Sequence, residues 1–179
     1  QLGRTLIEAG RLLRGRDRHR QLLMPAASDE RMSQCQALLD ELGAGGEVQL
    51  VRRQSREVMI AADVVILAPG TATLEAMLLE RPMGIADRVA PASWALMSRL
   101  AVTTHVGIPN ILAGRSVVPE LLQDALTAPA LALEAETLLA EGDRQVAALA
   151  GARTALASDF DREVGRCLGA LLGSALRPG

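Results

Sequence analysis

The chain has 179 residues, of which 49% are apolar and 22% are charged, a composition typical of one globular domain with a full hydrophobic core. A net charge of −2, with one Trp, one Phe and no Tyr, argues against nucleic-acid binding, which needs a basic surface or aromatic stacking. No window approaches the roughly 20 apolar residues of a membrane span, and nothing at the start resembles a secretion signal. We therefore expect a soluble, cytoplasmic protein in which Cys35 and Cys167 are free thiols.

The apolar pattern alternates between the period of a helix and that of a strand along the first half of the chain. In chain order we expect a helix at Leu2–Arg14, a short apolar run at Gln21–Ala27, a helix capped by Ser28 and running to Leu42, a strand at Val48–Val51, a helix at Arg56–Ala62 capped by Ser55, a strand at Val64–Leu67, a helix at Thr71–Glu80 and a strand at Met83–Ile85. This order is typical of a parallel sheet that helices connect.

The second half of the chain is richer in Ala and Leu at helical spacing. The expected helices are Ser93–Ala101, Val117–Gln123, Ala130–Glu141, Asp143–Ala157 and Asp159–Leu176, with Gly142 and Ser158 as breaks. Together the two halves predict an α/β fold, a doubly wound parallel sheet covered by helices on both sides. We expect Val64–Leu67 at its centre and Val48–Val51 beside it, both buried on both faces, because the first run is apolar throughout and the second is apolar except at Gln49.

The first candidate site follows the predicted central strand, at Ala68–Glu75. Gly70 lets the backbone approach a ligand closely, and Thr71 can cap a helix whose first amides face an anion. Glu75 lies four residues after Thr71 and so shares its helix face. A carboxylate there can accept two hydrogen bonds from a vicinal diol such as a ribose. The alternative, a capped helix with a solvated Glu, is equally compatible with the spacing.

Three further residues are candidates in the region after the predicted helix at Ser93–Ala101. Asn110 lies in a Gly-punctuated loop and could donate to a phosphate or a sugar hydroxyl, although a turn-forming Asn is the more common case. Glu120 and Gln123 are three residues apart on an expected helix and would point the same way; alone, they are typical of a solvated face.

Other features carry no site in this interpretation. Gly43–Gly46 follows a helix and precedes a strand, the reverse of a dinucleotide-binding fingerprint. The basic run from Arg11 to Arg20 is typical of a solvated helix face. His19 and His105 are far apart and have no companions at ligand spacing, so no metal site is expected.

Taken together, these segments resemble the lipid-A-disaccharide synthase family of glycosyltransferases, which join two acylated glucosamines. The resemblance spans nearly the whole chain and is carried by Ala68–Glu75, Met77-Leu78, Arg81-Pro82-Met83, Arg88, Pro91, Arg99-Leu100, Ile108–Arg115 and Val118–Gln123. The Pro-Asn-x-Leu-Ala-Gly run followed by Pro-Glu-Leu-Leu-Gln is quite specific, whereas Gly-Thr-x-x-Leu-Glu is shared more widely among glycosyltransferases. A Gly-Ser-Arg loop and its strand, which the family has just upstream of the first helix, are absent from this sequence.

The resemblance implies the C-terminal, nucleotide-sugar-binding domain of a GT-B type, inverting UDP-sugar glycosyltransferase. The resemblance implies that Glu75 would hold the ribose and that the Gly70–Thr71 helix start would approach the diphosphate. It also implies that Asn110 would lie near the diphosphate or sugar. Glu120 and Gln123 would line the cleft. It implies no metal or other cofactor, because helix dipoles and backbone amides stabilise the departing UDP. The catalytic base would belong to an N-terminal domain outside this sequence, so the chain alone should be inactive.

The resemblance also implies partners and a domain division. The substrates would be UDP-2,3-diacylglucosamine and 2,3-diacylglucosamine 1-phosphate. Peripheral contact with the inner membrane is compatible with the resemblance, and so is a homodimer with swapped C-terminal domains. Residues 1–157 would form the Rossmann-like domain, and a helix over 158–179 would cross back to the N-terminal domain. Two alternatives stay open from the residues: an enzyme like UDP-N-acetylglucosamine epimerase, and a non-catalytic remnant of the fold.

Overall fold

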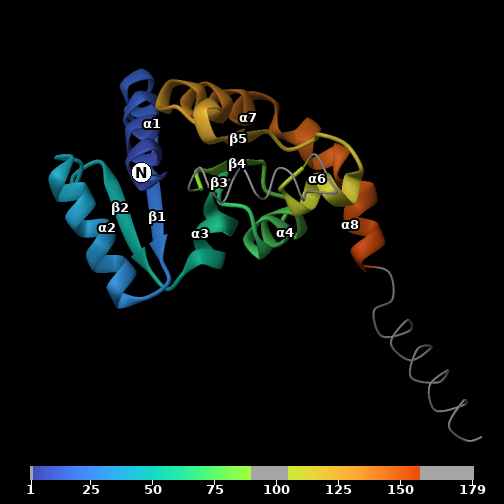
Figure 1. Cartoon of the computed structure of the whole chain (residues 1–179), viewed down its shortest axis with the longest axis horizontal. Coiled ribbons are helices and arrows are strands. Elements are labelled where there is room, and N and C mark those ends of the chain that lie inside the picture. Colours follow the sequence, from blue (N-terminus) through green and yellow to red (C-terminus); the bar gives the residue numbers. More distant parts are fainter. Residues whose placement is uncertain (1, 90–104, 158–179) are drawn as a thin grey trace, which may run out of the picture.

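The computed structural model describes residues 2–89 and 105–157, which fold into helices and two parallel sheets (Figure 1). In chain order the elements are α1 (Leu2–Arg16), β1 (Leu22–Ala26), α2 (Asp29–Glu41), β2 (Val48–Arg52), α3 (Ser55–Ala61), β3 (Val65–Leu67), α4 (Thr71–Leu78), β4 (Met83–Asp87), α6 (Ile108–Ala113), β5 (Glu120–Leu122), a 3₁₀ turn (Gln123–Ala125), α7 (Ala128–Ala148) and α8 (Ala150–Ala157). The expected helices at Ser93–Ala101 and Asp159–Leu176 lie outside the described residues.

The strands form a two-stranded sheet, β1–β2, and a three-stranded sheet in the order β3–β4–β5. Every pair is parallel: Leu22 lies opposite Val48 in the first sheet, and Val65 lies opposite Met83 in the second. The predicted α/β class with parallel strands is therefore confirmed. In the second sheet β4 is the middle strand, and four of its five residues are buried.

The predicted placement of Val64–Leu67 and Val48–Val51 is wrong. The strand β3, which forms within Val64–Leu67, lies at an edge of its sheet and does not pair with β2. Neither β2 nor β3 is buried throughout: Gln49 of β2 is exposed, and only Val65 of β3 is fully buried. A run of apolar residues shows that helices cover a strand, but it does not show which strands lie on either side of it.

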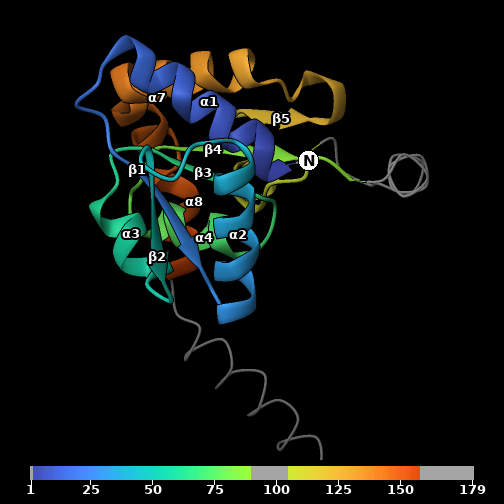
Figure 2. The same cartoon turned by 90° about the vertical axis from the view of Figure 1, so that its left-hand side faces the viewer.

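Helices cover both faces of the three-stranded sheet. Figures 1 and 2 both show α1 and α7 on one side of β3–β4–β5, and α3 and α4 on the other. The core follows these layers. One cluster joins α3, α4 and β4 through Met59, Met77 and Ile85, and another joins α1, β4 and α7 through residues such as Ala9 and Leu131. A third cluster, around Leu39 of α2, packs on β1–β2.

The predicted helix at Val117–Gln123 is wrong, because residues Glu120–Leu122 form strand β5. Pro119 restricts Val118 to an extended conformation, which opposes a helix at that point. Glu120 then pairs with Ile85 of the buried strand β4, so hydrogen bonding across the sheet decides the conformation. A single 3₁₀ turn follows at Gln123–Ala125.

The predicted break at Gly142 is also wrong, because α7 runs through it without interruption. Gly142 is buried, and a Cβ added there would lie 2.4 Å from Cγ of Pro82. The glycine therefore allows α7 to approach the segment before β4 closely, and it does not end a helix.

Two arginines at the end of α1 and in the following turn bind Glu136 of α7. Arg20 Nη1 lies 3.1 Å from Glu136 Oε1, and Arg16 is hydrogen-bonded to the other carboxylate oxygen. The hydrogen bond from Arg20, followed by the charge and hydrogen bond of Arg16, outweighs desolvation and lowers the pKa of Glu136 below its ordinary value.

We expect Glu136→Gln to reduce the dependence of stability on pH at the acidic end. A carboxyl with a lowered pKa in the folded chain contributes stability above its unfolded pKa, and this contribution is lost as pH falls through the folded pKa. In urea unfolding between about pH 3 and pH 7, the difference between wild type and variant should therefore shrink as pH falls. A difference that stays constant over this range would contradict the ion-pair role. Glu8→Gln, on the exposed face of α1, is the control.

Candidate functional site

The candidate site lies at the carboxyl edge of the three-stranded sheet. Because β3, β4 and β5 are parallel, the segments that follow them meet at one edge: Gly70–Thr71 after β3, Arg88 after β4 and Gln123 after β5. In open α/β sheets ligands bind at this edge, where loops and helix N-termini leave backbone groups free.

The start of α4 presents backbone amides at this edge. Gly70 is the N-cap residue, with φ of 147°, a conformation that residues with a side chain rarely adopt. Thr71 was expected to cap this helix; it is instead the first helical residue and is exposed, while the Thr73 hydroxyl donates to the Gly70 carbonyl over 2.7 Å. The Thr73 amide donates to the same carbonyl over 3.1 Å, whereas the amides of Thr71 and Ala72 make no hydrogen bond with the described residues, so these two can bind an anion.

Glu75 lies one turn into α4, on the same face as Thr71. Its side chain is half-buried, and its carboxylate makes no hydrogen bond or ion pair with the part of the chain that the structure describes. A partly desolvated carboxylate with free acceptor capacity, next to free amide donors, can bind a ligand that carries both hydroxyl groups and an anion.

Asn110 of α6 is fully buried, with 0% of its surface exposed. Its Oδ1 accepts from the backbone amides of Val117 and Val118, each at 2.8 Å. Its Nδ2 donates to the Val118 carbonyl at 2.7 Å and to Glu120 Oε1 at 2.8 Å. All four hydrogen-bonding positions of the amide are thus used inside the protein. The expectation that Asn110 donates to a ligand needs correction, because this amide fixes the loop between α6 and β5.

Glu120 of β5 is brought next to Asn110 and also binds the segment before α6. Its carboxylate accepts from the backbone amides of Val106 at 3.1 Å and Gly107 at 3.0 Å. Since Gly107 is the N-cap residue of α6, the negative charge lies where the helix dipole favours it. Glu120 therefore positions the start of α6 on the sheet.

Gln123 does not share a helix face with Glu120, contrary to the expectation. It follows β5 with φ of 53°, in the left-handed region. Its side chain is half-buried at the carboxyl edge of the sheet, and its backbone carbonyl accepts from Arg88 Nη2 at 3.2 Å.

Arg88 is a further candidate, which was not among the site residues expected from the sequence. It follows β4 directly, and its Nη2 also donates to the Leu126 carbonyl at 2.7 Å. These two bonds leave the other guanidinium nitrogen atoms for a ligand at the same edge. A basic residue directly after a strand was the signal that could have identified it.

The candidates thus fall into groups on neighbouring elements. Gly70, Thr71 and Glu75 lie on α4, which packs against α6, where Asn110 and Glu120 meet. Gln123 and Arg88 lie together at the ends of β5 and β4. Among residues 2–89 and 105–157 no group of three or more His, Cys, Asp or Glu side chains could hold a metal ion.

Comparison with known proteins identifies the family. The model of the lipid-A-disaccharide synthetase family matches residues 2–164. Two similar proteins are lipid-A-disaccharide synthases: that of Pseudomonas savastanoi pv. phaseolicola is 36% identical over 98% of this chain and 46% of its own length. That of Verminephrobacter eiseniae is 46% identical over 73% of this chain and 33% of its own length. The chain belongs to the lipid-A-disaccharide synthetase family.

The six residues expected from the sequence and Arg88 all lie within the part that matches the lipid-A-disaccharide synthetase model. The chain spans less than half of the length of the curated relatives that it matches. No helix in the described ranges, 2–89 and 105–157, is long and apolar enough to cross a membrane.

Proposed function

We propose that this chain is the UDP-sugar-binding half of a glycosyltransferase that joins UDP-2,3-diacylglucosamine to 2,3-diacylglucosamine 1-phosphate in lipid A biosynthesis. Membership of the lipid-A-disaccharide synthetase family supports the reaction class, and the relatives' names supply the product. The observation that carries the nucleotide assignment is the carboxylate of Glu75, which has no partner among residues 2–89 and 105–157 and lies one turn after a glycine N-cap at the carboxyl edge of a parallel sheet.

In this proposal the residues divide into those that contact the ligand and those that hold the site. Glu75 accepts hydrogen bonds from the ribose hydroxyls, and the amides after Gly70 face the diphosphate. Arg88 adds positive charge at the same edge, and Gln123 lines the cleft beside it. Asn110 and Glu120 act indirectly, because together they fix the start of α6, which packs on α4. The catalytic base would come from polypeptide outside this sequence.

Calorimetry with UDP tests the proposal. Glu75→Ala removes two charge-assisted hydrogen bonds to the ribose, each worth about 1.5–3 kcal/mol, so the affinity for UDP should fall at least about tenfold. Glu75→Gln should lose less, since its amide oxygen still accepts one hydrogen bond. The matched control is Glu57→Ala, which removes an exposed carboxylate from α3 and should leave UDP binding unchanged. Equal affinity of wild type and Glu75→Ala would remove the ribose role.

A transfer assay on the same chain tests whether it binds UDP without catalysing transfer. With UDP-diacylglucosamine and the acylated glucosamine phosphate supplied, we expect UDP binding but no disaccharide, because the acceptor pocket and base are assigned elsewhere. Measurable transfer would overturn the half-enzyme proposal.

Since both substrates carry acyl chains, we place the reaction in the cytoplasm at the surface of the inner membrane, where such lipids are presented. A homodimer with swapped C-terminal domains is part of the same proposal. The molecular mass of the protein in solution would show whether it is a dimer.

A further inference from the structure

Gln123 has a backbone conformation that residues other than glycine rarely adopt. Among residues 2–89 and 105–157, three such residues have a φ in the left-handed region: Arg53, Glu80 and Gln123. This conformation costs free energy in a residue with a side chain, so the surrounding structure has to hold it. Arg53 and Glu80 are exposed, and each forms an ion pair, with Asp29 at 3.7 Å and with Arg153 at 3.0 Å. Gln123 differs from both in its surroundings.

The backbone of Gln123 is held by two hydrogen bonds. Its carbonyl accepts from the Leu126 amide at 3.1 Å and from Arg88 Nη2 at 3.2 Å. Arg88 also donates to the Leu126 carbonyl, so the turn after β5 is fixed to the end of β4. These bonds involve only the backbone of Gln123, and they stabilise the same turn whichever side chain the residue carries. The turn itself therefore does not explain why the residue is a glutamine.

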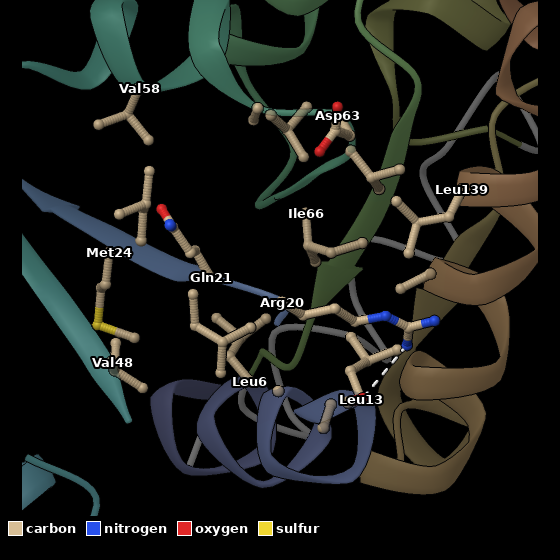
Figure 3. A pocket seen from close by; sticks show the side chains of 18 of the residues that line it. Leu6, Leu13, Arg20, Gln21, Met24, Val48, Val58, Asp63, Ile66 and Leu139 are labelled. Atoms are coloured by element: carbon tan, nitrogen blue, oxygen red, sulfur yellow. Dashed lines mark hydrogen bonds between the residues drawn. The ribbon is translucent and has the colours of Figure 1, made fainter. Parts of the chain in front are cut away.

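The side chain of Gln123 is half-buried, and it makes no hydrogen bond with the part of the chain that the structure describes. Glycine would adopt this backbone conformation without the cost that a side chain brings. The glutamine instead places two amide donors and one acceptor where water is partly excluded. The apolar cleft between β1 and β3 is lined by Leu6, Met24 and Ile66 among others, and Gln123 does not line it (Figure 3). The amide belongs to the carboxyl edge of β3–β4–β5.

The order of the strands gives the order of the groups along this edge. Neighbouring strands lie about 4.8 Å apart, so the end of β5 lies about 5 Å beyond β4 and about 10 Å beyond β3. In the proposed function the amides after Gly70, which follows β3, face the diphosphate, and Arg88 follows β4. A UDP-sugar whose diphosphate lies over Gly70 and Arg88 brings its sugar next to Gln123. A sugar is uncharged and rich in hydroxyl groups, which an uncharged amide can bind as donor or acceptor.

We propose that the side-chain amide of Gln123 binds a hydroxyl group of the sugar and so distinguishes the sugar nucleotide from UDP. This inference rests on the proposed function, to which it adds the contact that recognises the transferred group. In the proposed donor, UDP-2,3-diacylglucosamine, the free hydroxyl groups of the sugar are those on carbons 4 and 6. Gln123 binds one of these, while Glu75 and the amides after Gly70 bind the part of the ligand that UDP also contains.

Calorimetry on the full chain with two ligands tests the role of Gln123. The probes are UDP and UDP-N-acetylglucosamine, which is soluble and keeps the hydroxyl groups on carbons 4 and 6. The quantity compared is the dissociation constant for UDP-N-acetylglucosamine divided by that for UDP. Gln123→Ala removes the hydrogen bond to the sugar, so this ratio should rise about fivefold above that of wild type.

Two glycine variants separate the side chain from the backbone. Gln123→Gly should raise the ratio as Gln123→Ala does, and it should unfold at a higher temperature than Gln123→Ala, because glycine adopts the left-handed conformation without strain. Glu80→Gly is the matched control. It also replaces a residue with a positive φ, but it lies after the last residue of α4, away from the start of that helix. Its ratio should equal that of wild type.

NMR measures the same contact at the amide itself. The side-chain amide signals of Gln123 are identified by their absence in Gln123→Ala. They should shift more at saturating UDP-N-acetylglucosamine than at saturating UDP. The amide signals of Gln36, which is exposed on α2, should shift with neither ligand. Equal shifts of the Gln123 signals with both ligands would contradict a contact with the sugar.

Two calorimetric results would overturn the inference. The first is an unchanged ratio in both Gln123→Ala and Gln123→Gly. The second is an equal loss of affinity for both ligands, which would give Gln123 a structural role or a contact with UDP. Either result can occur while UDP binds wild type and binds Glu75→Ala more weakly, so the inference can fail while the proposed function stands. Absence of UDP binding to wild type would refute the proposed function and this inference with it.

Discussion

Replacing Asn110 by Asp should lower the free energy of unfolding at pH 7 by about 3–5 kcal/mol, because it buries an unpaired charge. The new carboxylate keeps one oxygen that accepts from the amides of Val117 and Val118. Its second oxygen, however, takes the place of the amide nitrogen that donates to the Val118 carbonyl and to the Glu120 carboxylate. Two negative groups then face each other over a distance that is 2.8 Å in the wild type.

The loss of stability in Asn110→Asp should grow as pH rises, whereas the stability that an ordinary ion pair gives is lost as pH falls. Burial and the charge of Glu120 raise the pKa of the new carboxyl in the folded chain above its unfolded value. The variant is therefore least destabilised at low pH, where the carboxyl is protonated and can donate, and the loss grows as pH rises through the folded pKa. Urea unfolding at several pH values measures this dependence.

Asn110→Leu is the matched control for this pH effect. It has similar volume and removes all four hydrogen bonds without adding a titrating group, so its loss of stability should be nearly independent of pH. If Asn110→Asp and wild type had equal stability at pH 7, the burial and bonding of this side chain would not be as the structure shows. Loss of UDP binding in a folded Asn110→Leu chain would show that the loop held by Asn110 shapes the site.

Replacing Gln145 by Leu should lower the free energy of unfolding by about 2–4 kcal/mol, since it leaves two buried backbone groups without partners. Gln145 of α7 is buried, and its side-chain amide pairs with the backbone of Met83 in both directions. Its Oε1 accepts from the Met83 amide at 2.8 Å, and its Nε2 donates to the Met83 carbonyl at 2.9 Å. Met83 is itself fully buried at the start of the middle strand.

Gln36→Leu is the control for this second prediction. Gln36 is exposed on α2 and donates only to Asp40, four residues along the same helix. The free energy of unfolding of Gln36→Leu should stay within about 0.5 kcal/mol of wild type, the range of exposed helix pairs. Thermal or urea unfolding compares the two variants with wild type. Equal stability of Gln145→Leu and Gln36→Leu would show that the amide does not join α7 to β4 in solution.

The sequence by itself determined most local elements of the first half of the chain, and it determined the family. The period of the apolar residues located α1, α2, α3 and α4 within two residues at each boundary, although the expected cap of α3, Ser55, is its first helical residue. Ser28 does cap α2, with its side chain accepting from the amide of Arg31. Interactions of this kind join residues three or four positions apart, so a short window of sequence contains both partners. The resemblance to lipid-A-disaccharide synthases was likewise carried by contiguous motifs.

Only the tertiary structure decided which strand is central, why Gly142 is a glycine and what Asn110 does. β4 is the middle strand although it contains Gly84 and is less apolar than Val64–Leu67, because its place depends on pairing with both β3 and β5. Gln145 and Met83 are 62 residues apart, and Arg20 and Glu136 are 116 residues apart. Which groups meet over such separations depends on how whole layers pack and exclude water. The sequence pattern records that a residue will be buried, and the packed fold supplies its partner.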